Sequence, residues 1–310
     1  MKSAKKSHAM QQRARKVRAA GGAPSRPAPA LAIAGVRPSK SRGQNFLTSG
    51  AIAARIVAAA EIGAGDEVLE IGPGLGILTE KIVAHPFQRF TIVELDSRLA
   101  ARISERFAAG RQDIKIVNAD FLSIDFQSIA TQPPIKVIGN LPFNVAAAIL
   151  RRLCDNARAI SRMVLMFQRE VAARIRARPT DDAYGALSVF TALYWEIASH
   201  FAVAAGSFHP RPKVDAEVLV FRPRATAAFA PDEERSVLEV VRASFSAPRK
   251  TIRNALSHSL GLASAETVAS LESAGRDPGA RAETLDVPDF VRLARALTSQ
   301  HAPAVMKKNA

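Results

Sequence analysis

From about residue 50 onward, the sequence alternates between short apolar runs and helix-like stretches. Five runs have strand character: 66–72 (DEVLEIG), 89–96 (RFTIVELD), 114–120 (IKIVNAD), 135–140 (IKVIGN) and 162–168 (RMVLMFQ). Helix-like stretches lie between most of them, at 51–62, 76–85, 98–108 and 146–154. Near-continuous apolar strands separated by helices are typical of a parallel sheet covered on both faces. The sequence therefore predicts an α/β fold, to which the run 216–224 adds a last strand.

The character of the chain changes after Pro231, where the strand-like runs stop. Four helix-like stretches follow one another, at 232–245, 249–260, 265–275 and 289–299. The chain of 310 residues is long enough for one large domain or two unequal ones. We therefore expect a Rossmann-like domain over 43–228, a small all-helical domain over 229–300 and a short tail over 301–310.

Residues 1–42 are strongly basic. They contain 11 Lys and Arg and no Asp or Glu, so the formal charge of +15 leaves only +4 for the rest of the chain. Much of the segment is Ala, Gly and Pro, which predicts a disordered tail. Three interpretations stay open. The tail is an arm that binds polyanions, a solvated extension, or an organelle transit peptide whose amphipathicity Gly and Pro interrupt.

Composition excludes several other classes of protein. No run of about 18 apolar residues is present, so we expect no membrane span. Cys154 is the only cysteine, which excludes an intramolecular disulfide framework and a cysteine-based zinc site. No spacing among the histidines indicates a metal site either. We therefore expect an intracellular protein without a metal.

Three glycines, Gly72, Gly74 and Gly76, lie between the first strand and the helix that follows it. Such a turn lets a ligand approach the backbone closely, although an ordinary strand–helix turn has the same spacing. The next strand ends at Glu94, and the one after it at Asp120. Ligands bind at the carboxyl ends of strands in such sheets, where Glu94 suits ribose hydroxyls and Asp120 suits the amine of adenine. The pattern predicts a site for an adenine nucleoside.

The acid before the glycines, Glu70, narrows the choice of nucleoside. In dinucleotide-binding proteins the glycine turn receives a pyrophosphate. A carboxylate at Glu70 would repel phosphate but tolerate the amino-acid part of S-adenosylmethionine. The pattern of Glu70, the glycines, Glu94 and Asp120 resembles the methyltransferases that use this donor.

The run 137–144 (VIGNLPFN) ends the fourth strand on Asn140, Leu141, Pro142 and Phe143. An amine conjugated to a ring, such as adenine N6, is a poor nucleophile because its lone pair is delocalised. The side-chain oxygen of Asn140 and the carbonyl of Leu141 can each accept one of its N–H groups and expose that lone pair. Pro142 would fix the direction of the carbonyl, and Phe143 would stack on an extruded base. A β-turn with a surface aromatic residue is the alternative.

The tetrapeptide Asn-Leu-Pro-Phe is similar to the signature of amino-group adenine methyltransferases. In this variant it resembles the rRNA adenine N6,N6-dimethyltransferases, and the resemblance runs from about Arg42 to Leu297. It implies a Rossmann-like S-adenosylmethionine-dependent fold whose donor-binding residues are Asn45, Leu47, Gly72, Glu94, Asp120 and Asn140. It also implies that Phe208, in the loop GSFHPRPKVDAEVLVF (206–221), covers the second face of the target base.

Two departures from the family pattern stand out. Phe143 replaces the Tyr that bacterial members usually carry, which keeps stacking but loses a hydroxyl hydrogen bond. The basic extension before the opening motif SRGQNFL (41–47) is also longer than usual.

The family divides into enzymes of small-subunit rRNA and resistance enzymes of large-subunit rRNA. The stretch ASFSAPRKTIRNALSH (243–258) resembles the small-subunit branch. Within it, we expect Arg249 and Arg253 to share a helix face and, with Lys250, to bind phosphate; Arg211 and Lys213 extend this basic stripe. A solvated basic helix is the alternative.

The resemblance implies dimethylation of N6 of two adjacent adenosines near the 3′ end of small-subunit rRNA, in support of small-subunit maturation. A large-subunit resistance methyltransferase and a non-catalytic RNA-binding protein of ribosome assembly are the alternatives. Intact Glu94, Asp120 and Asn140 favour an enzyme. We expect a cytoplasmic monomer that meets no membrane, or a mitochondrial one if the tail is a transit peptide.

Overall fold

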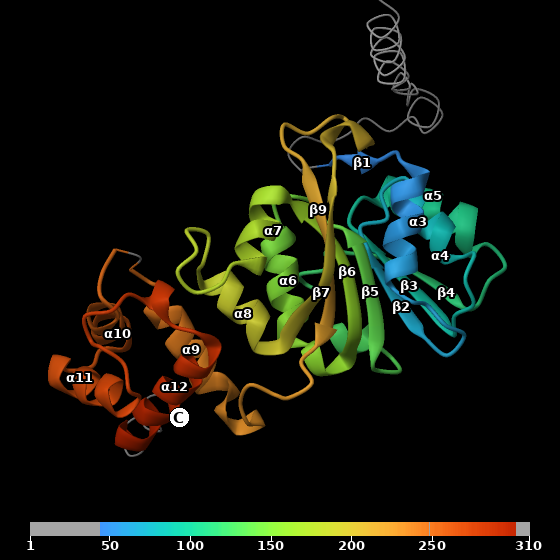
Figure 1. The fold of residues 1–310 in the computed structure, drawn as a ribbon. Helices are drawn as coiled ribbons and strands as arrows, with labels where there is room; N and C mark the ends of the chain where they lie inside the picture. Colours follow the sequence, from blue (N-terminus) through green and yellow to red (C-terminus); the bar gives the residue numbers. More distant parts are fainter. Residues whose placement is uncertain (1–43, 248, 302–310) are drawn as a thin grey trace, which may run out of the picture. The chain divides into compact units, whose positions relative to one another are not determined.

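In the computed structural model, residues 44–247 and 249–301 are described, and within them seven strands form one sheet in the order β4-β3-β2-β5-β6-β9-β7 (Figure 1). The parallel strands are β2 (Glu67–Ile71), β3 (Arg89–Glu94), β4 (Ile114–Asn118), β5 (Ile135–Asn140) and β6 (Ile160–Gln168). Two antiparallel strands, β9 (Ala216–Pro223) and β7 (Trp195–Val203), complete the sheet. The predicted tail over 1–42 and residues 302–310 lie outside the described residues.

Helices cover both faces of this sheet. Alternate residues of a strand point to opposite faces, so one strand packs against helices on both sides. Val68 of β2 packs with α3 (Gly50–Ala59), α4 (Ile77–Ile82) and α5 (Ser97–Ile103), which a π-helical turn (Ser104–Ala108) continues. Leu69 and Ile71 of the same strand pack with α6 (Ala146–Asp155) and α7 (Arg169–Arg176) on the other face. Both faces of the central strands are therefore buried, as the apolar runs predicted.

The register of the strands brings three chain segments to one edge. Ile71 of β2 pairs with Val93 of β3 and with Gly139 of β5. Glu94 and Asn140 therefore end their strands beside the glycine turn that follows β2. This is the edge at which ligands bind in sheets of this kind.

A separate two-stranded sheet joins segments that lie far apart in the sequence. Leu47 of β1 (Phe46–Leu47) pairs with Phe208 of β8 (Phe208–His209), which follows a short 3-10 turn (Ala205–Ser207). Thr48 N also donates to Ser207 O over 2.8 Å. This pair ties the start of the described chain to the loop between β7 and β9.

The C-terminal part consists of α9 (Glu234–Ser244), α10 (Ile252–Leu260), α11 (Ser264–Ser273) and α12 (Val287–His301). These four helices were predicted, and the structure confirms them. Their apolar core also includes Val189, Phe190 and Leu193 of α8 (Ala186–Tyr194). Single 3-10 turns occur at Phe126–Ser128, Ala157–Ala159, Pro231–Glu233 and Ala282–Thr284. The domain boundary predicted between residues 228 and 229 stays a prediction.

The sequence failed to predict β7. This strand lies at the edge of the sheet, so much of it is exposed, and its register to β9 shifts between Ile197 and Ser199. Glu196 and His200 are exposed, and the strand lacks the continuous apolar run that marked the buried strands. Its antiparallel neighbour β9 was predicted correctly, because both of its faces are buried through most of its length.

We predict that Phe221→Ala lowers the free energy of unfolding by about 3–5 kcal/mol, as is typical when a buried aromatic side chain is removed. Phe221 of β9 is fully buried, with its ring centroid 6.2 Å from that of Phe167 and 6.5 Å from that of Trp195. Chemical denaturation followed by circular dichroism measures the change. Val214→Ala is the control, because Val214 is 45% exposed and its truncation should change stability by less than about 0.5 kcal/mol. Equal effects of the two substitutions would contradict the assigned core.

Candidate functional site

A pocket opens at the carboxyl edge of the parallel strands. It has about 610 Å³ of empty space, which includes space open to solvent. Its walls come from segments 44–47, 72–75, 77–78 and 140–143, together with Glu94 and Leu99. The pocket therefore brings together most of the residues that the sequence predicted for the methyl donor and for chemistry.

The glycine turn forms the floor of the pocket in a backbone conformation that other residues rarely adopt. Gly72 has φ of 69° and Gly74 has φ of 56°, both in the left-handed region. A Cβ atom on Gly74 would lie only 2.8 Å from Cδ1 of Phe46. Gly74 thus allows the Phe46 ring to lie directly against the turn.

Glu94 at the end of β3 is tied to this turn. Its Oε2 accepts a hydrogen bond from Gly74 N over 3.3 Å, and its Oε1 accepts one from Asp96 N over 2.8 Å. Burial raises the pKa of the Glu94 carboxyl above its usual range. In dinucleotide-binding proteins such a turn faces a pyrophosphate. Here a carboxyl group occupies the Gly74 N–H, which disfavours phosphate and leaves acceptor lone pairs for hydroxyl groups.

Glu70 requires a correction. Its side chain is fully buried and does not line the pocket, and its Oε2 accepts a hydrogen bond from Thr79 Oγ1 over 2.7 Å. Burial, with a smaller contribution from the charge of Glu94, raises the pKa of Glu70 to about 8. Glu70 is therefore mainly neutral at pH 7, and the predicted negative charge before the glycines is wrong. Glu94 is the acid that faces them.

The Asn140 amide is oriented by the first described segment of the chain. Its Nδ2 donates to the backbone oxygen of Asn45 over 3.3 Å, which leaves Oδ1 to act as an acceptor. The Leu141 side chain is 1% exposed and anchors the tetrapeptide in the core. Phe143 is half-buried and lines the pocket beside them. Acceptor, proline and aromatic ring thus lie together at the pocket wall.

Phe208 contacts Phe143 but does not lie parallel to it. The two ring centroids are 6.4 Å apart with an interplanar angle of 64°, and Phe208 is only 3% exposed. Its pairing with Leu47 holds it in this position. A base does not fit between the rings as they lie, so one ring must turn before Phe208 can cover a base.

Several predicted site residues lie outside the pocket. Asp120 is exposed two residues beyond β4, and its Oδ1 accepts a hydrogen bond from Leu122 N over 2.9 Å. Arg211 and Lys213 are exposed on the loop between β8 and β9. The roles predicted for these residues stay predictions.

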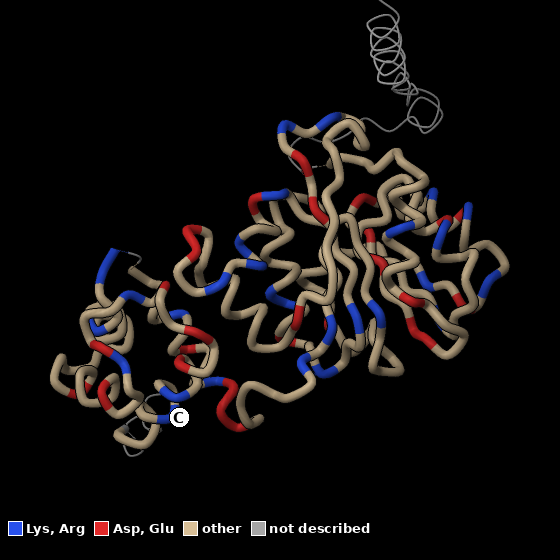
Figure 2. The backbone as a smooth tube through the Cα atoms, viewed as in Figure 1, with Lys and Arg blue, Asp and Glu red and all other residues tan. Residues whose placement is uncertain are grey.

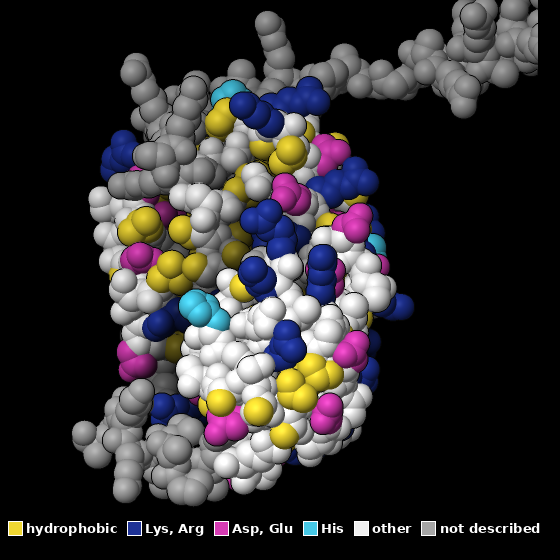
Figure 3. Space-filling view, turned by 90° about the vertical axis from the view of Figure 1, so that its left-hand side faces the viewer, with side chains coloured by type: hydrophobic (Ala, Val, Ile, Leu, Met, Phe, Trp, Pro, Cys, Tyr) yellow, Lys and Arg dark blue, Asp and Glu magenta, His cyan; other side chains and the backbone are white. Residues whose placement is uncertain are grey.

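The predicted helix face of Arg249 and Arg253 is wrong. Thr251 is the N-cap of α10, and its side chain accepts a hydrogen bond from Asn254 N, so the helix begins only at Ile252. Arg249 and Lys250 therefore precede the helix and are exposed, whereas Arg253 lies in its first turn. Figure 2 marks the Lys and Arg positions in blue, and Figure 3 shows one face on which their side chains gather over its upper and middle parts.

The described residues contain neither a metal-binding cluster nor a membrane-spanning helix. Within 44–247 and 249–301, no group of three or more His, Cys, Asp or Glu is arranged to hold a metal ion. In the same part of the chain, none of the helices has both the length and the apolar character needed to span a bilayer.

Sequence reasoning missed several pocket residues, which are apolar or neutral: Gln44, Phe46, Pro73, Leu75, Ile77, Leu78 and Leu99. Most of them have the residue types of an ordinary core, so their type does not indicate a ligand. Phe46 is the exception, because it lies between two residues that were predicted. Its packing on Gly74 depends on a contact between segments that no sequence spacing reveals.

Comparisons with known proteins agree on one family. The profile described as ribosomal RNA adenine dimethylase matches residues 36–298. A protein of Moorella thermoacetica named ribosomal RNA small subunit methyltransferase A is 40% identical over 272 residues, which cover 85% of this chain and 93% of that protein. A protein of the same name from Xanthomonas axonopodis pv. citri is 41% identical over 255 residues, which cover 82% and 94%.

Solved structures share the fold. A dimethyladenosine transferase from Plasmodium falciparum has a TM-score of 0.67 at 23% identity and covers 80% of this chain and 95% of its own. The 23S rRNA methyltransferase ErmE has a TM-score of 0.60 at 29% identity and covers 82% and 99%. These similarities confirm the predicted α/β methyltransferase fold with its helical C-terminal part.

We predict that Gly74→Ala lowers the affinity for S-adenosylmethionine by about tenfold or more, since a strained backbone residue costs roughly 1–3 kcal/mol. An alanine would be strained at this φ, and its Cβ would displace the Phe46 ring and shift the N–H that holds Glu94. Isothermal titration calorimetry measures the affinity. Gly65→Ala is the control, because no atom lies within 4 Å of a Cβ built there. Wild-type affinity in Gly74→Ala would contradict the assigned pocket floor.

We predict that Glu70→Gln gains stability relative to wild type as pH rises from 5.5 to 8. Native Glu70 keeps its proton up to a pKa of about 8, whereas the unfolded chain releases it near 4.5. Wild-type stability therefore falls across this window, by at most about 1.4 kcal/mol per pH unit from this group, and levels off above it. Denaturant unfolding of both proteins without ligand at several pH values tests this. Glu80→Gln, at an exposed position of α4, controls for removing a carboxylate. A pH-independent difference would contradict a neutral Glu70.

Proposed function

The chain belongs to the ribosomal RNA adenine dimethylase family, and we propose that it dimethylates N6 of two adjacent adenosines near the 3′ end of small-subunit rRNA. One observation carries the proposal. The Asn140 amide is held by the backbone of Asn45, with Pro142 and Phe143 on the same pocket wall. This wall faces the glycine turn and Glu94, so an acceptor for an amine and a site for a nucleoside share one pocket.

The residues that line the pocket support S-adenosylmethionine as the methyl donor. Glu94 presents lone pairs suited to ribose hydroxyls, and the turn at Gly72 and Gly74 lines the pocket with backbone rather than side chains. Asn45 and Leu47 close the pocket from the first segment, and Asp120 is assigned to the amine of the donor adenine. When bound, S-adenosylmethionine supplies a methyl group on a sulfonium, which is electrophilic.

The protein's task is to make a weak nucleophile available and to place it. The Asn140 Oδ1 and the Leu141 carbonyl each accept one N–H of the target N6, which localises its lone pair. Pro142 restricts the backbone so that the carbonyl keeps its direction. Phe143 stacks on the base after it leaves its own stack. Positioning of this kind contributes to rate without a catalytic acid, base or metal.

Two features favour the small-subunit branch. The relatives with about 40% identity are named for the small subunit, whereas the large-subunit enzyme ErmE is 29% identical. The exposed Arg249 and Lys250, with Arg253 in the first turn of α10, provide charges for rRNA phosphates, and the exposed Arg211 and Lys213 add further charges. The substrate is thus small-subunit rRNA or its maturing particle. The enzyme acts as a monomer in the cytoplasm, with a mitochondrial address in the basic tail as the alternative.

A methyl-transfer assay with labelled S-adenosylmethionine tests the proposal. Unmethylated small-subunit particles and large-subunit rRNA are offered side by side, and the product nucleoside is identified by mass. We expect N6,N6-dimethyladenosine in the small-subunit rRNA alone. Label in the large-subunit rRNA would overturn the branch, and no transfer to either RNA would overturn the activity.

We predict that Asn140→Ala lowers kcat/KM by about 100-fold or more, because it removes an acceptor that acts on the reacting amine. RNA affinity should persist, since the basic segments are unchanged. Asn156→Ala is a matched control. Asn156 is also a half-buried amide whose Nδ2 donates to a backbone carbonyl, that of Arg152, but it lies near the opposite edge of the sheet. Full activity in Asn140→Ala would exclude the assigned role.

A further inference from the structure

The loop between α7 and α8, residues 177–185, is braced by its own hydrogen bonds. Arg178 N donates to Asp181 Oδ2 over 2.8 Å, and Tyr184 N donates to Asp181 O over 2.9 Å. The buried Ser188 closes the loop, since its Oγ donates to Arg174 O and accepts from Gly185 N. These hydrogen bonds fix the loop to the end of α7. That helix begins directly after β6, at the edge of the sheet that holds the pocket.

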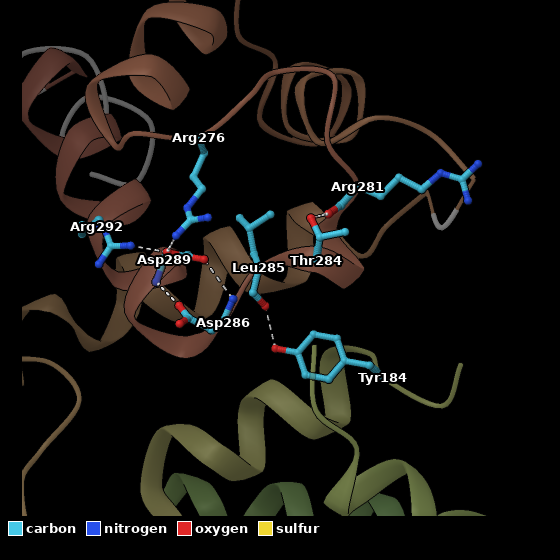
Figure 4. Close-up of polar contacts among 8 residues, drawn as sticks. All are labelled: Tyr184, Arg276, Arg281, Thr284, Leu285, Asp286, Asp289 and Arg292. Carbon is cyan, nitrogen blue, oxygen red and sulfur yellow. Dashed lines mark hydrogen bonds and ion pairs between the residues drawn. The ribbon is translucent and has the colours of Figure 1, made fainter. Parts of the chain in front are cut away.

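This loop docks on the C-terminal helices through two hydrogen bonds. Thr180 N donates to Glu283 O over 2.9 Å, and the Tyr184 hydroxyl donates to Leu285 O over 2.8 Å. Figure 4 shows the Tyr184 side chain reaching from the α7–α8 loop to the Leu285 carbonyl. Burial, with smaller contributions from Asp286 and Asp289, raises the pKa of Tyr184, so its hydroxyl remains a donor.

The segment that receives Tyr184 is itself held in place. Asp286 and Asp289 accept hydrogen bonds from each other's backbone N–H at the start of α12. Arg276 and Arg292 both pair with the buried Asp289 (Figure 4). The Leu285 carbonyl is therefore a fixed acceptor rather than part of a loose loop.

The ring of Tyr184 contacts Phe245, the root of the basic segment 249–253, which begins four residues further along the chain. Its centroid lies 6.2 Å from that of Phe245, which ends α9, and Phe245 lies 5.8 Å from Phe290 in the helical core. Within the basic segment, Ile252 N donates to Ala280 O over 2.8 Å. Tyr184 thus contacts both the segment that follows Ala280, at Leu285, and Phe245, four residues before Arg249.

We propose that Tyr184 is a positioning residue for the RNA substrate. It links the catalytic edge, through α7, to the basic segment, so that rRNA phosphates bound by Arg249 and Lys250 align the target adenine with Asn140. The RNA substrate in this inference rests on the proposed function, whereas the contacts of Tyr184 do not. It assigns Tyr184 no contact with the reacting atoms.

The chain contains a matched control, because it has only two tyrosines. Tyr194 is also half-buried, packs its ring on Phe229 at 5.7 Å, and donates its hydroxyl across to α9, to Glu234 Oε1 over 2.6 Å. It contacts the first turn of α9, however, whereas Tyr184 contacts Phe245 at the other end. Tyr194→Phe therefore removes a comparable hydrogen bond without touching the root of the basic segment.

Steady-state methylation of small-subunit particles tests the proposal. Tyr184→Phe should raise KM for particles about threefold to tenfold, the fold-change expected for one lost hydrogen bond, with kcat changed by less than about twofold. The Kd for S-adenosylmethionine should stay at its wild-type value. Tyr184→Leu, which also loses the ring contact, should raise KM further, and Tyr194→Phe should leave it unchanged.

A double-mutant cycle separates positioning from general stabilisation. In a protein carrying Arg249→Gln and Lys250→Gln, adding Tyr184→Phe should leave KM unchanged, because the aligned charges are already absent. A KM shift that persists undiminished in that background overturns the proposal. Wild-type KM in both Tyr184 variants, or an equal shift in Tyr194→Phe, also overturns it. If the wild-type protein transfers no methyl group, the proposed function fails, and the affinity of the same variants for particles then decides this inference.

Discussion

The strands β2, β3 and β5 end at the same edge of the sheet, and the rest of the site depends on this constraint. Parallel pairing fixes the register, so the residue after each strand emerges at the same edge. The glycine turn, Glu94 and Asn140 are thereby neighbours although they lie far apart in the sequence. The Gly74 to Glu94 hydrogen bond then joins two of these strand ends directly. The pairing of the strands therefore brings these residues together at one edge without a special loop.

Sequence reasoning succeeded where it relied on this constraint. The apolar runs identified five parallel strands and β9, and the residues that end the strands identified Gly72, Glu94 and Asn140. It failed where a property depends on three-dimensional surroundings. Glu70 has the residue type of a charged ligand, yet complete burial leaves it neutral. Asp120 follows its strand by two residues and is exposed outside the pocket, so its role at the donor adenine stays a prediction.

Contact between distant segments accounts for two further features that the sequence did not reveal. The role of Phe208 on a base stays a prediction, but its pairing with Leu47 sets its ring edge-on to Phe143. The exposed edge strand β7 shows no strand pattern of its own, since its partner β9 determines its register. The start of α10 depends on a local cap at Thr251, a signal that the sequence did contain.

The charges around the pocket explain why a cationic donor suits it better than a dinucleotide. Two carboxyl groups, Glu70 and Glu94, are largely buried, and the charge of Glu94 adds to the cost of ionising Glu70. The protein relieves this by keeping Glu70 protonated and by bonding Glu94 to two backbone N–H groups. A ligand with positive charge stabilises the ionised form of Glu94, whereas a pyrophosphate would compete with Glu94 for the Gly74 N–H and repel it. Glu94 is therefore the acid that favours S-adenosylmethionine over a phosphate-bearing nucleotide, whereas Glu70 is the buried acid that weakens the protein at high pH.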